Sequence, residues 1–240
     1  MCVIFFAIEQ RPETPLVLLA NRDEFYERPT LAAAAWPDRP NIRGGRDLVS
    51  GGTWLGVTDG GRFAAVTNYR DPSSAKGTRS RGRLVSDFLL SDEPVAEYMA
   101  MIERSAGEYS GFNLIAGEIA DGRVTAAWFS DRGERVEMLT PGIYGLSNSL
   151  LDTPWPKVTK GKEVFRRILE NGDDREAMFD LLADRELADD ADLPQTGIGY
   201  EREKALSAIF IETPVYGTRC STVVTADRSG RLDLVERTFV

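Results

Sequence analysis

The chain has 240 residues, of which 29 are basic, 38 are acidic and none is histidine, so its formal net charge is −9. The absence of histidine excludes Ser-His-Asp triads, Cys-His dyads and histidine-ligated zinc or haem. The acidic balance disfavours nucleic acid and anionic membrane surfaces as partners. Since a hydrophobic share of 42% is that of a globular chain with a sizeable core, we expect the partner to be a small molecule.

The start of the chain carries no recognisable export or membrane signal. The apolar run at residues 3–8 has no positively charged segment before it and stops at Glu9, which is too short for a signal peptide or a membrane span. The two cysteines, Cys2 and Cys220, are too few for a disulfide framework. The sequence therefore predicts a cytoplasmic protein, and it leaves the oligomeric state open.

Residues 3–8 are an apolar run rich in β-branched and aromatic residues, and a second apolar run at 16–20 follows a turn bounded by prolines. They predict a buried antiparallel hairpin. Residues 53–57 and 63–67 flank Asp59 and the glycine after it, a dipeptide typical of tight hairpin turns. We therefore expect four strands before residue 70.

Apolar residues at helical spacing predict a pair of helices between residues 83 and 105. The remaining pattern predicts strands at 112–116, 124–129, 136–139, 143–147, 209–211, 221–226 and 232–239, helices at about 157–169 and 175–182, and an acidic surface excursion at 184–196. Grouped strands that alternate with grouped helices indicate an α+β fold with two stacked antiparallel sheets and helices outside. With no linker and no repeat, we expect one domain over 1–240.

Cys2 lies at the head of a predicted buried strand. If Met1 is removed, the mature chain begins with a thiol and a free α-amine, whose pKa of about 7.7–8.0 suits a general base for its own side chain. Such a nucleophile needs no histidine. The alternative is a small apolar strand residue, because free cysteine is often simply buried.

Four polar residues, Asn21 to Glu24, follow the second predicted strand. A hairpin brings the end of its second strand beside the start of its first, so this cluster should lie near Cys2. A buried carboxylate there could hold the Cys2 ammonium. The alternative is a strand-ending turn with solvated charges.

Several short motifs resemble a known family. They are Met1-Cys2, Ala20-Asn21-Arg22-Asp23-Glu24, Gly44-Gly45-Arg46-Asp47, Gly51-Gly52-Thr53-Trp54-Leu55-Gly56, Thr67-Asn68-Tyr69-Arg70, Gly145-Leu146-Ser147-Asn148 and Arg219-Cys220-Ser221-Thr222. Together they resemble the NRDE family, also called the transport and Golgi organization 2 family, from end to end. The glycine pairs lack the spacing of phosphate-binding loops and are interpreted as turns.

That family is similar to the N-terminal nucleophile hydrolases of the penicillin V acylase and bile salt hydrolase branch. The resemblance implies a four-layer αββα sandwich, Cys2 as the nucleophile and Asp23 as the residue that orients its amine. It also places Asn68 and Asn148 where those enzymes have oxyanion-stabilising amides. Without the resemblance, the two asparagines are strand-end caps.

Other positions are candidates for substrate binding. Asn21, Arg22, Trp54 and Arg219 belong to the resembling motifs, although Trp54 is also a natural core residue. Bile salt hydrolases carry an arginine where this chain has Ala20. Arg22 is a candidate replacement, but strand alternation points it to the opposite face from its neighbours.

The resemblance leaves three functions open. The first is a hydrolase without cofactor that cleaves a carbon–nitrogen amide or another acyl bond through a Cys2 thioester. The second is a non-catalytic carrier of haem or of an acyl or lipid ligand, in which iron would need Cys2, Cys220, a tyrosine or a methionine. The third is a pseudo-enzyme without a ligand. The substrate is not predicted.

Overall fold

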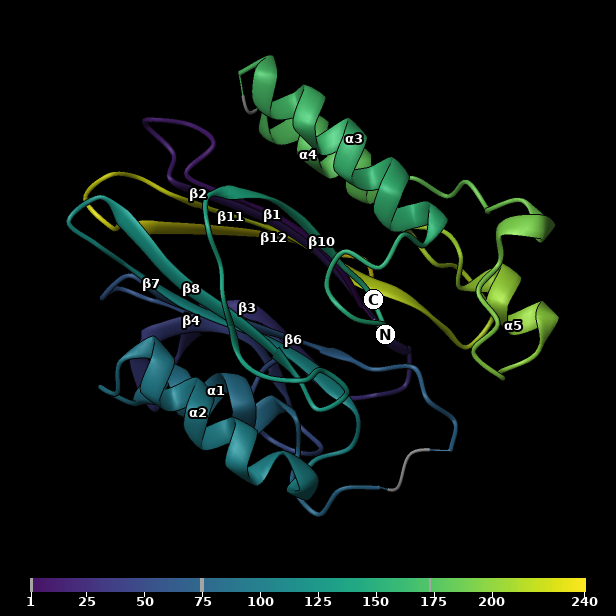
Figure 1. Cartoon of the computed structure of the whole chain (residues 1–240), viewed down its shortest axis with the longest axis horizontal. Helices are drawn as coiled ribbons and strands as arrows, with labels where there is room; N and C mark the ends of the chain where they lie inside the picture. The colour runs from purple at the N-terminus through teal and green to yellow at the C-terminus, as the bar shows by residue number, and fades with distance from the viewer. Residues whose placement is uncertain (1, 74–75, 173) are drawn as a thin grey trace.

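The structure is a computed structural model that describes residues 2–73, 76–172 and 174–240. Two antiparallel sheets are stacked on each other, and helices cover their outer faces (Figure 1). Within the described residues, the first sheet has the strand order β10-β1-β2-β11-β12 and the second has the order β3-β4-β5-β6-β7-β8-β9. The predicted α+β sandwich is confirmed.

The first sheet is built from both ends of the chain. Its strands are β1 (Cys2–Ile8), β2 (Leu16–Phe25), β10 (Gly142–Leu146), β11 (Tyr216–Ala226) and β12 (Leu232–Thr238). The second sheet contains β3 (Thr30–Trp36), β4 (Arg39–Asp47), β5 (Leu55–Thr58), β6 (Arg62–Asn68), β7 (Phe112–Ala120), β8 (Arg123–Ser130) and β9 (Glu137–Met138). Because β1 and β2 both lie inside the first sheet, their residues are largely buried.

The helices form two outer layers. The second sheet is covered by α1 (Gly82–Leu90) and α2 (Val95–Ser105), and the first sheet by α3 (Pro156–Glu170) and α4 (Arg175–Leu182) (Figure 1). A short α5 (Tyr200–Ala205) follows the predicted excursion. In the part of the chain that the structure describes, no helix is both long and apolar enough to cross a membrane.

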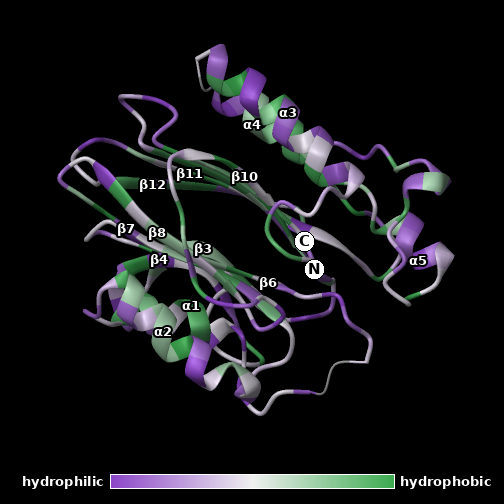
Figure 2. Ribbon diagram, viewed as in Figure 1, coloured by the Kyte–Doolittle hydropathy of each residue, from purple (hydrophilic) through white to green (hydrophobic). Residues whose placement is uncertain are grey.

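Strand alternation divides the core into layers. Even-numbered residues of β1 and β2, such as Ile4 and Leu18, belong to the apolar cluster between the sheets. Odd-numbered residues, such as Phe5 and Leu19, pack with Phe165 of α3 and with α4. A third cluster joins the second sheet to α1 and α2. In Figure 2 the strands of the first sheet are largely hydrophobic, whereas many connecting loops are hydrophilic.

Two local predictions are wrong. Six strands precede residue 70 in the described part of the chain instead of the expected four. The sequence did not predict β3 and β4, because their alanines, arginines and glycines show no alternation of apolar and polar residues. Residues 209–211 form no strand. Ile209 is buried beside α4 instead, and the Ile211 backbone N–H donates to the Thr218 hydroxyl over 2.9 Å.

Candidate active site

Cys2, Arg22 and Cys220 lie in register across three neighbouring strands. Cys2 is paired with Arg22 between β1 and β2, and Arg22 is paired with Cys220 between β2 and β11. The polar cluster at 21–24 is thus part of a central strand, and Asn21, Arg22 and Asp23 are each at most 5% exposed. The alternative of a solvated turn is therefore wrong.

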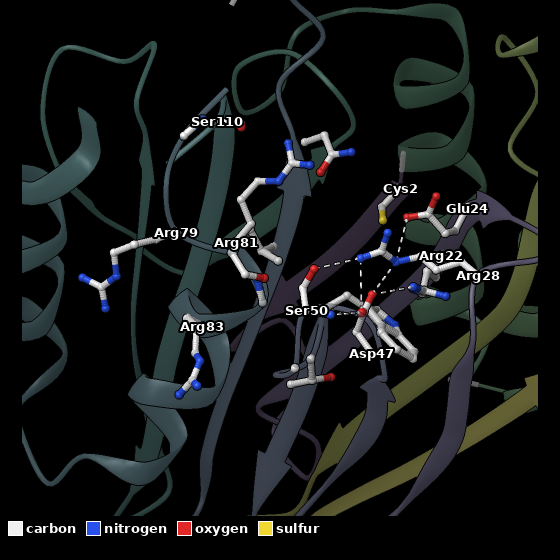
Figure 3. Close-up of a pocket in the computed structure, with 18 of the residues that line it drawn as sticks. Cys2, Arg22, Glu24, Arg28, Asp47, Ser50, Arg79, Arg81, Arg83 and Ser110 are labelled. Carbon is white, nitrogen blue, oxygen red and sulfur yellow. Dashed lines mark hydrogen bonds and ion pairs between the residues drawn. The ribbon is translucent and has the colours of Figure 1, made fainter. Parts of the chain in front are cut away.

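A cavity of about 760 Å³ opens beside Cys2. Its volume is within the usual range for small-molecule sites. It is lined mainly by polar residues of β2, of the end of β4 and the loop that follows, and of the segment at 77–83, together with Trp54, Val66 and Asn68. Figure 3 shows Cys2 on one side of it with Arg22, Glu24 and Arg28. Cys2, Asp23 and Asn68 thus line one cavity.

The Asp23 carboxyl is buried and held from β11. The Thr218 hydroxyl donates to its Oδ1 over 2.8 Å, and the Tyr216 hydroxyl donates to the Asp23 backbone carbonyl over 2.9 Å. Burial raises the pKa of the Asp23 carboxyl, while the Thr218 hydrogen bond and the charge of Lys157 oppose that rise. The Thr218 hydrogen bond therefore orients the Asp23 carboxyl group.

Burial also raises the pKa of the Cys2 thiol, and the nearby Asp23 charge adds to the rise. The thiol is therefore largely protonated at neutral pH. A nucleophile of this kind needs a base within reach, and the sequence expectation assigns that role to the Cys2 α-amine. Met1, whose removal would free the amine, lies outside the described residues.

Arg22 points between the sheets, toward the face on which Cys2 lies. Its guanidinium lies 4.2 Å from the centre of the Trp54 ring. It donates to Thr30 Oγ1 over 3.2 Å and to Asp47 Oδ2 over 3.4 Å. Alternation does turn Arg22 away from its neighbours, but that direction leads into the cavity, where it lies beside Trp54.

Asn21 points the other way and joins strands to helices. Its Nδ2 donates to the Leu182 and Ile209 carbonyls over 2.8 and 3.0 Å, and its Oδ1 accepts from the Ser221 hydroxyl over 2.6 Å. All the hydrogen-bonding capacity of the amide nitrogen is used there. Asn21 does not line the cavity.

Asn68 and Asn148 lie together but differ in exposure. Asn68 lines the cavity at the end of β6. Asn148 is 1% exposed and does not line the cavity; its Nδ2 donates to the Asn68 backbone carbonyl over 2.9 Å. The neighbouring Ser147 hydroxyl donates to the Cys2 carbonyl over 3.2 Å. This loop therefore ties the Cys2 backbone to the Asn68 backbone.

Arg219 is not brought to the cavity. Its guanidinium donates to the backbone carbonyls of Phe25, Arg28 and Val240. Those contacts fasten the β2–β3 connection to the end of the chain. Arg219 instead lines a separate small pocket together with Arg22 and Trp54, and its role in substrate binding stays a prediction.

Comparison with known proteins identifies the family. The family model of Transport and Golgi organisation 2 matches residues 1–240. The chain belongs to this family. The Transport and Golgi organization protein 2 homolog of Bos taurus is 40% identical over 100% of this chain and 94% of its own length. The Homo sapiens homolog is 36% identical with the same coverage of both chains.

A solved structure shows the fold of this Transport and Golgi organisation 2 family member. The Caenorhabditis elegans ortholog of N-acylethanolamine-hydrolyzing acid amidase superposes with a TM-score of 0.53. The match covers 95% of this chain and 93% of that one at 11% identity. The predicted fold of the N-terminal nucleophile hydrolases is confirmed.

The site of this family member also contains a set of charged residues that the sequence did not predict. Arg79, Arg81 and Arg83 occur at every second position around the start of α1 and line the cavity, as do Arg28 and Asp47. The alternating arginines were the available signal, but the start of the helix pair obscured it. The acidic composition of the whole chain also gave no hint of a cavity with this many arginines.

Lys157 was also missed. It is 4% exposed at the start of α3, and its Nζ donates to the Leu206 carbonyl over 2.9 Å. Burial lowers the pKa of Lys157 to about 8, while the charge of Asp23 opposes the fall. A buried ammonium therefore lies within electrostatic range of the Asp23 carboxylate. No sequence pattern distinguished this lysine from an ordinary helical one.

Proposed function

We propose that this protein is a cytoplasmic hydrolase that cleaves a carbon–nitrogen amide bond, or another acyl bond, of a small molecule through a thioester on Cys2. The observation that carries the proposal is the meeting of Cys2, Asp23 and Asn68 at one cavity. The pairing of β1, which begins at Cys2, with β2, which carries the 21–24 cluster, supports it. Membership of a family whose fold is that of N-terminal nucleophile hydrolases is consistent with the same chemistry.

Each proposed step has a residue suited to it. The free Cys2 α-amine takes the thiol proton as Sγ attacks the acyl carbon, so that a C–S bond forms and the carbonyl π electrons move to oxygen. Asn68 donates to that oxyanion. As the tetrahedral intermediate collapses, the C–N bond breaks and the ammonium returns its proton to the leaving amine. Water then attacks the thioester, which releases the acid and restores the thiol.

Asp23 has a separate role in this scheme. Its carboxylate holds and orients the Cys2 ammonium, and Thr218 fixes the carboxylate through Oδ1. Because the pKa of the Cys2 thiol is raised, the thiol must pass its proton to a nearby amine for the attack to occur. The proposal therefore requires removal of Met1, because an amide-linked nitrogen cannot accept a proton at neutral pH.

The first experiment is the intact mass of the purified protein, which reports whether Met1 is present. Protein that begins with Cys2 is then incubated with a panel of acyl amides and thioesters, together with Cys2→Ala and Cys2→Ser variants. Cys220→Ala is the matched control, because Cys220 is buried and does not line the cavity. We expect a covalent acyl adduct and turnover in wild type and Cys220→Ala only. Equal turnover in Cys2→Ala protein would refute the proposal.

The alternative of a haem carrier does not fit the residues of this cavity. A porphyrin needs an extended apolar surface, whereas five arginines and four carboxylates line this wall, with Trp54 and Val66 among its few large apolar residues. The raised pKa of the Cys2 thiol also disfavours a thiolate ligand. Cys220 does not line the cavity. The same polar lining disfavours storage of a lipid chain, so hydrolysis is the function that the site supports best.

A further inference from the structure

The cavity beside Cys2 has an uneven arrangement of charge. Four of its five lining arginines form ion pairs with carboxylates, namely Arg22 and Arg28 with Asp47, and Arg79 and Arg83 with Asp87. Arg81 lines the same cavity and has no carboxylate partner within the described residues. The one described hydrogen bond of its side chain runs from Nη1 to the Gly111 carbonyl over 3.1 Å. Most of its donors therefore remain available to a ligand.

Arg81 is also held where a ligand would reach it. It is half-buried immediately before α1, and its bond to Gly111 ties the side chain to the start of β7. In Figure 3 its guanidinium points toward the side of the cavity where Cys2 lies, whereas those of Arg79 and Arg83 point away from it. The Glu24 carboxylate also acts on the Arg81 guanidinium, as does Cys2 when its thiol is ionised, which places the three groups in one electrostatic neighbourhood.

The energetics of this arrangement favour an anion. Partial removal of a guanidinium from water costs free energy unless a partner compensates, and one neutral carbonyl compensates only in part. A carboxylate, phosphate or sulfonate group matches the planar fork of arginine with two parallel hydrogen bonds. Because the whole chain carries a net charge of −9, a cationic group inside a cavity is not explained by the general composition.

We propose that Arg81 binds an anionic oxygen group on the molecule whose acyl bond meets Cys2, so that the substrates are acidic acyl compounds. The inference rests on the proposed function only in calling the ligand a substrate. Arg81 is then a specificity-determining residue that selects charged over neutral molecules. Since Arg81 lies across the cavity from Cys2, the anionic group and the scissile bond are separate parts of one ligand.

The test measures binding without turnover. Cys2→Ala protein is titrated calorimetrically with N-octanoylglycine, N-octanoyltaurine, N-octanoylphosphoethanolamine and neutral N-octanoylethanolamine. We expect at least one acidic compound to bind about tenfold or more tightly than the neutral one, and the identity of that compound distinguishes carboxylate, sulfonate and phosphate. In the Arg81→Gln background that preference should fall by about ten- to a hundredfold, the usual value of a charged hydrogen bond.

Two controls separate recognition from folding. Arg79→Gln removes a neighbouring arginine that already pairs with Glu108 over 3.1 Å, and it should retain the preference. Arg81→Lys keeps the charge but loses the fork, and it should retain part of it. Inorganic phosphate added to protein with Arg81 intact should weaken binding of the acidic compound alone. The proposal is overturned if all four compounds bind equally, or if Arg81→Gln and Arg79→Gln bind the acidic compounds alike.

Measuring turnover by the wild-type protein distinguishes failure of the hydrolase proposal from failure of the anion-site proposal. If acid binding depends on Arg81 but no thioester forms on Cys2, the hydrolase proposal fails and the anion site stands. If wild type and Arg81→Gln hydrolyse the neutral and acidic compounds at the same ratio, the hydrolase proposal stands and the anion site is wrong.

Discussion

The side chain of Asn148 donates a hydrogen bond to the backbone carbonyl of Asn68 over 2.9 Å. Asn68 lines the cavity and Asn148 does not. The two asparagines that the sequence treats as equivalent therefore have different contacts. We infer that Asn68 faces the reacting group, and that Asn148 fixes the backbone from which Asn68 projects.

We therefore expect substitution of Asn68 to lower mainly activity and substitution of Asn148 to lower mainly stability. Asn68→Ala should lower kcat by about a hundredfold or more, as loss of one oxyanion donor does, with little change in Tm. Asn148→Ala removes a buried hydrogen bond worth about 1–3 kcal/mol, so it should lower Tm by about 2–10 °C and reduce kcat less. Steady-state kinetics and thermal unfolding of both variants check this. Equal Tm values for the two variants would contradict it.

Thr218→Val should alter the acid side of the pH–rate profile. The Thr218 hydroxyl donates to Asp23 Oδ1 and lowers the pKa of that carboxyl. Its loss therefore raises the Asp23 pKa, so the carboxylate is protonated at a higher pH and the acid limb of kcat/KM moves upward. Thr222→Val is the matched control on the same strand, because Thr222 bonds Glu236 instead. Superimposable acid limbs would count against a role for Asp23.

Cys2 should react slowly with iodoacetamide at neutral pH. Burial raises the pKa of its thiol, so the reactive thiolate accumulates only at a pH above that of an ordinary cysteine. The alkylation rate should therefore keep rising beyond the ordinary cysteine pKa, as peptide mass spectrometry can follow. A Cys220→Ser background removes the second thiol. Rapid, pH-independent modification below pH 8 would show that the thiol is already ionised.

The lowered pKa of Lys157 should make the free energy of unfolding depend on pH. Its folded pKa of about 8 lies below its ordinary value of 10.5, so the unfolded chain binds the proton more tightly between those values. The contribution of Lys157 to the unfolding free energy should therefore rise as pH increases from 8 to 10.5. Urea unfolding of wild type and Lys157→Met across this window should show an unfolding free energy that rises more, or falls less, with pH in wild type than in the variant.

A surface lysine of the same helix is the control for that measurement. Lys162 bonds Asp152 over 2.7 Å and is not fully buried. Lys162→Met should follow the wild-type pH profile. Equal slopes for wild type and Lys157→Met from pH 8 to 10.5 would mean that Lys157 titrates normally.

Local patterns predicted much of the fold. The helix expected at 175–182 coincides with α4, and the hairpin around Asp59 joins β5 to β6. Regular apolar spacing carries that information. β3 and β4 lack it, and α5 has only six residues. Those elements are held by tertiary contacts, which a local pattern does not record.

The candidate site was predictable only in part. Strand pairing placed Asp23 near Cys2, because a hairpin fixes its own register. Alternation predicted the direction of Arg22 but not what lies on that face, which depends on Trp54 from the opposite sheet. Arg81 reaches the cavity through the stacking of the two sheets and α1, so only the tertiary structure revealed it.

Strand β2 is flanked by β1 on one side and by β11 on the other. Asp23 thus depends on a partner, Thr218, that is synthesised almost two hundred residues later. Pairings this distant along the chain form slowly and cooperatively. The emerging chain on a ribosome consequently holds its thiol without the groups that would activate it. On the proposed function, Cys2 therefore gains the full set of partners of a nucleophile only when synthesis is nearly complete.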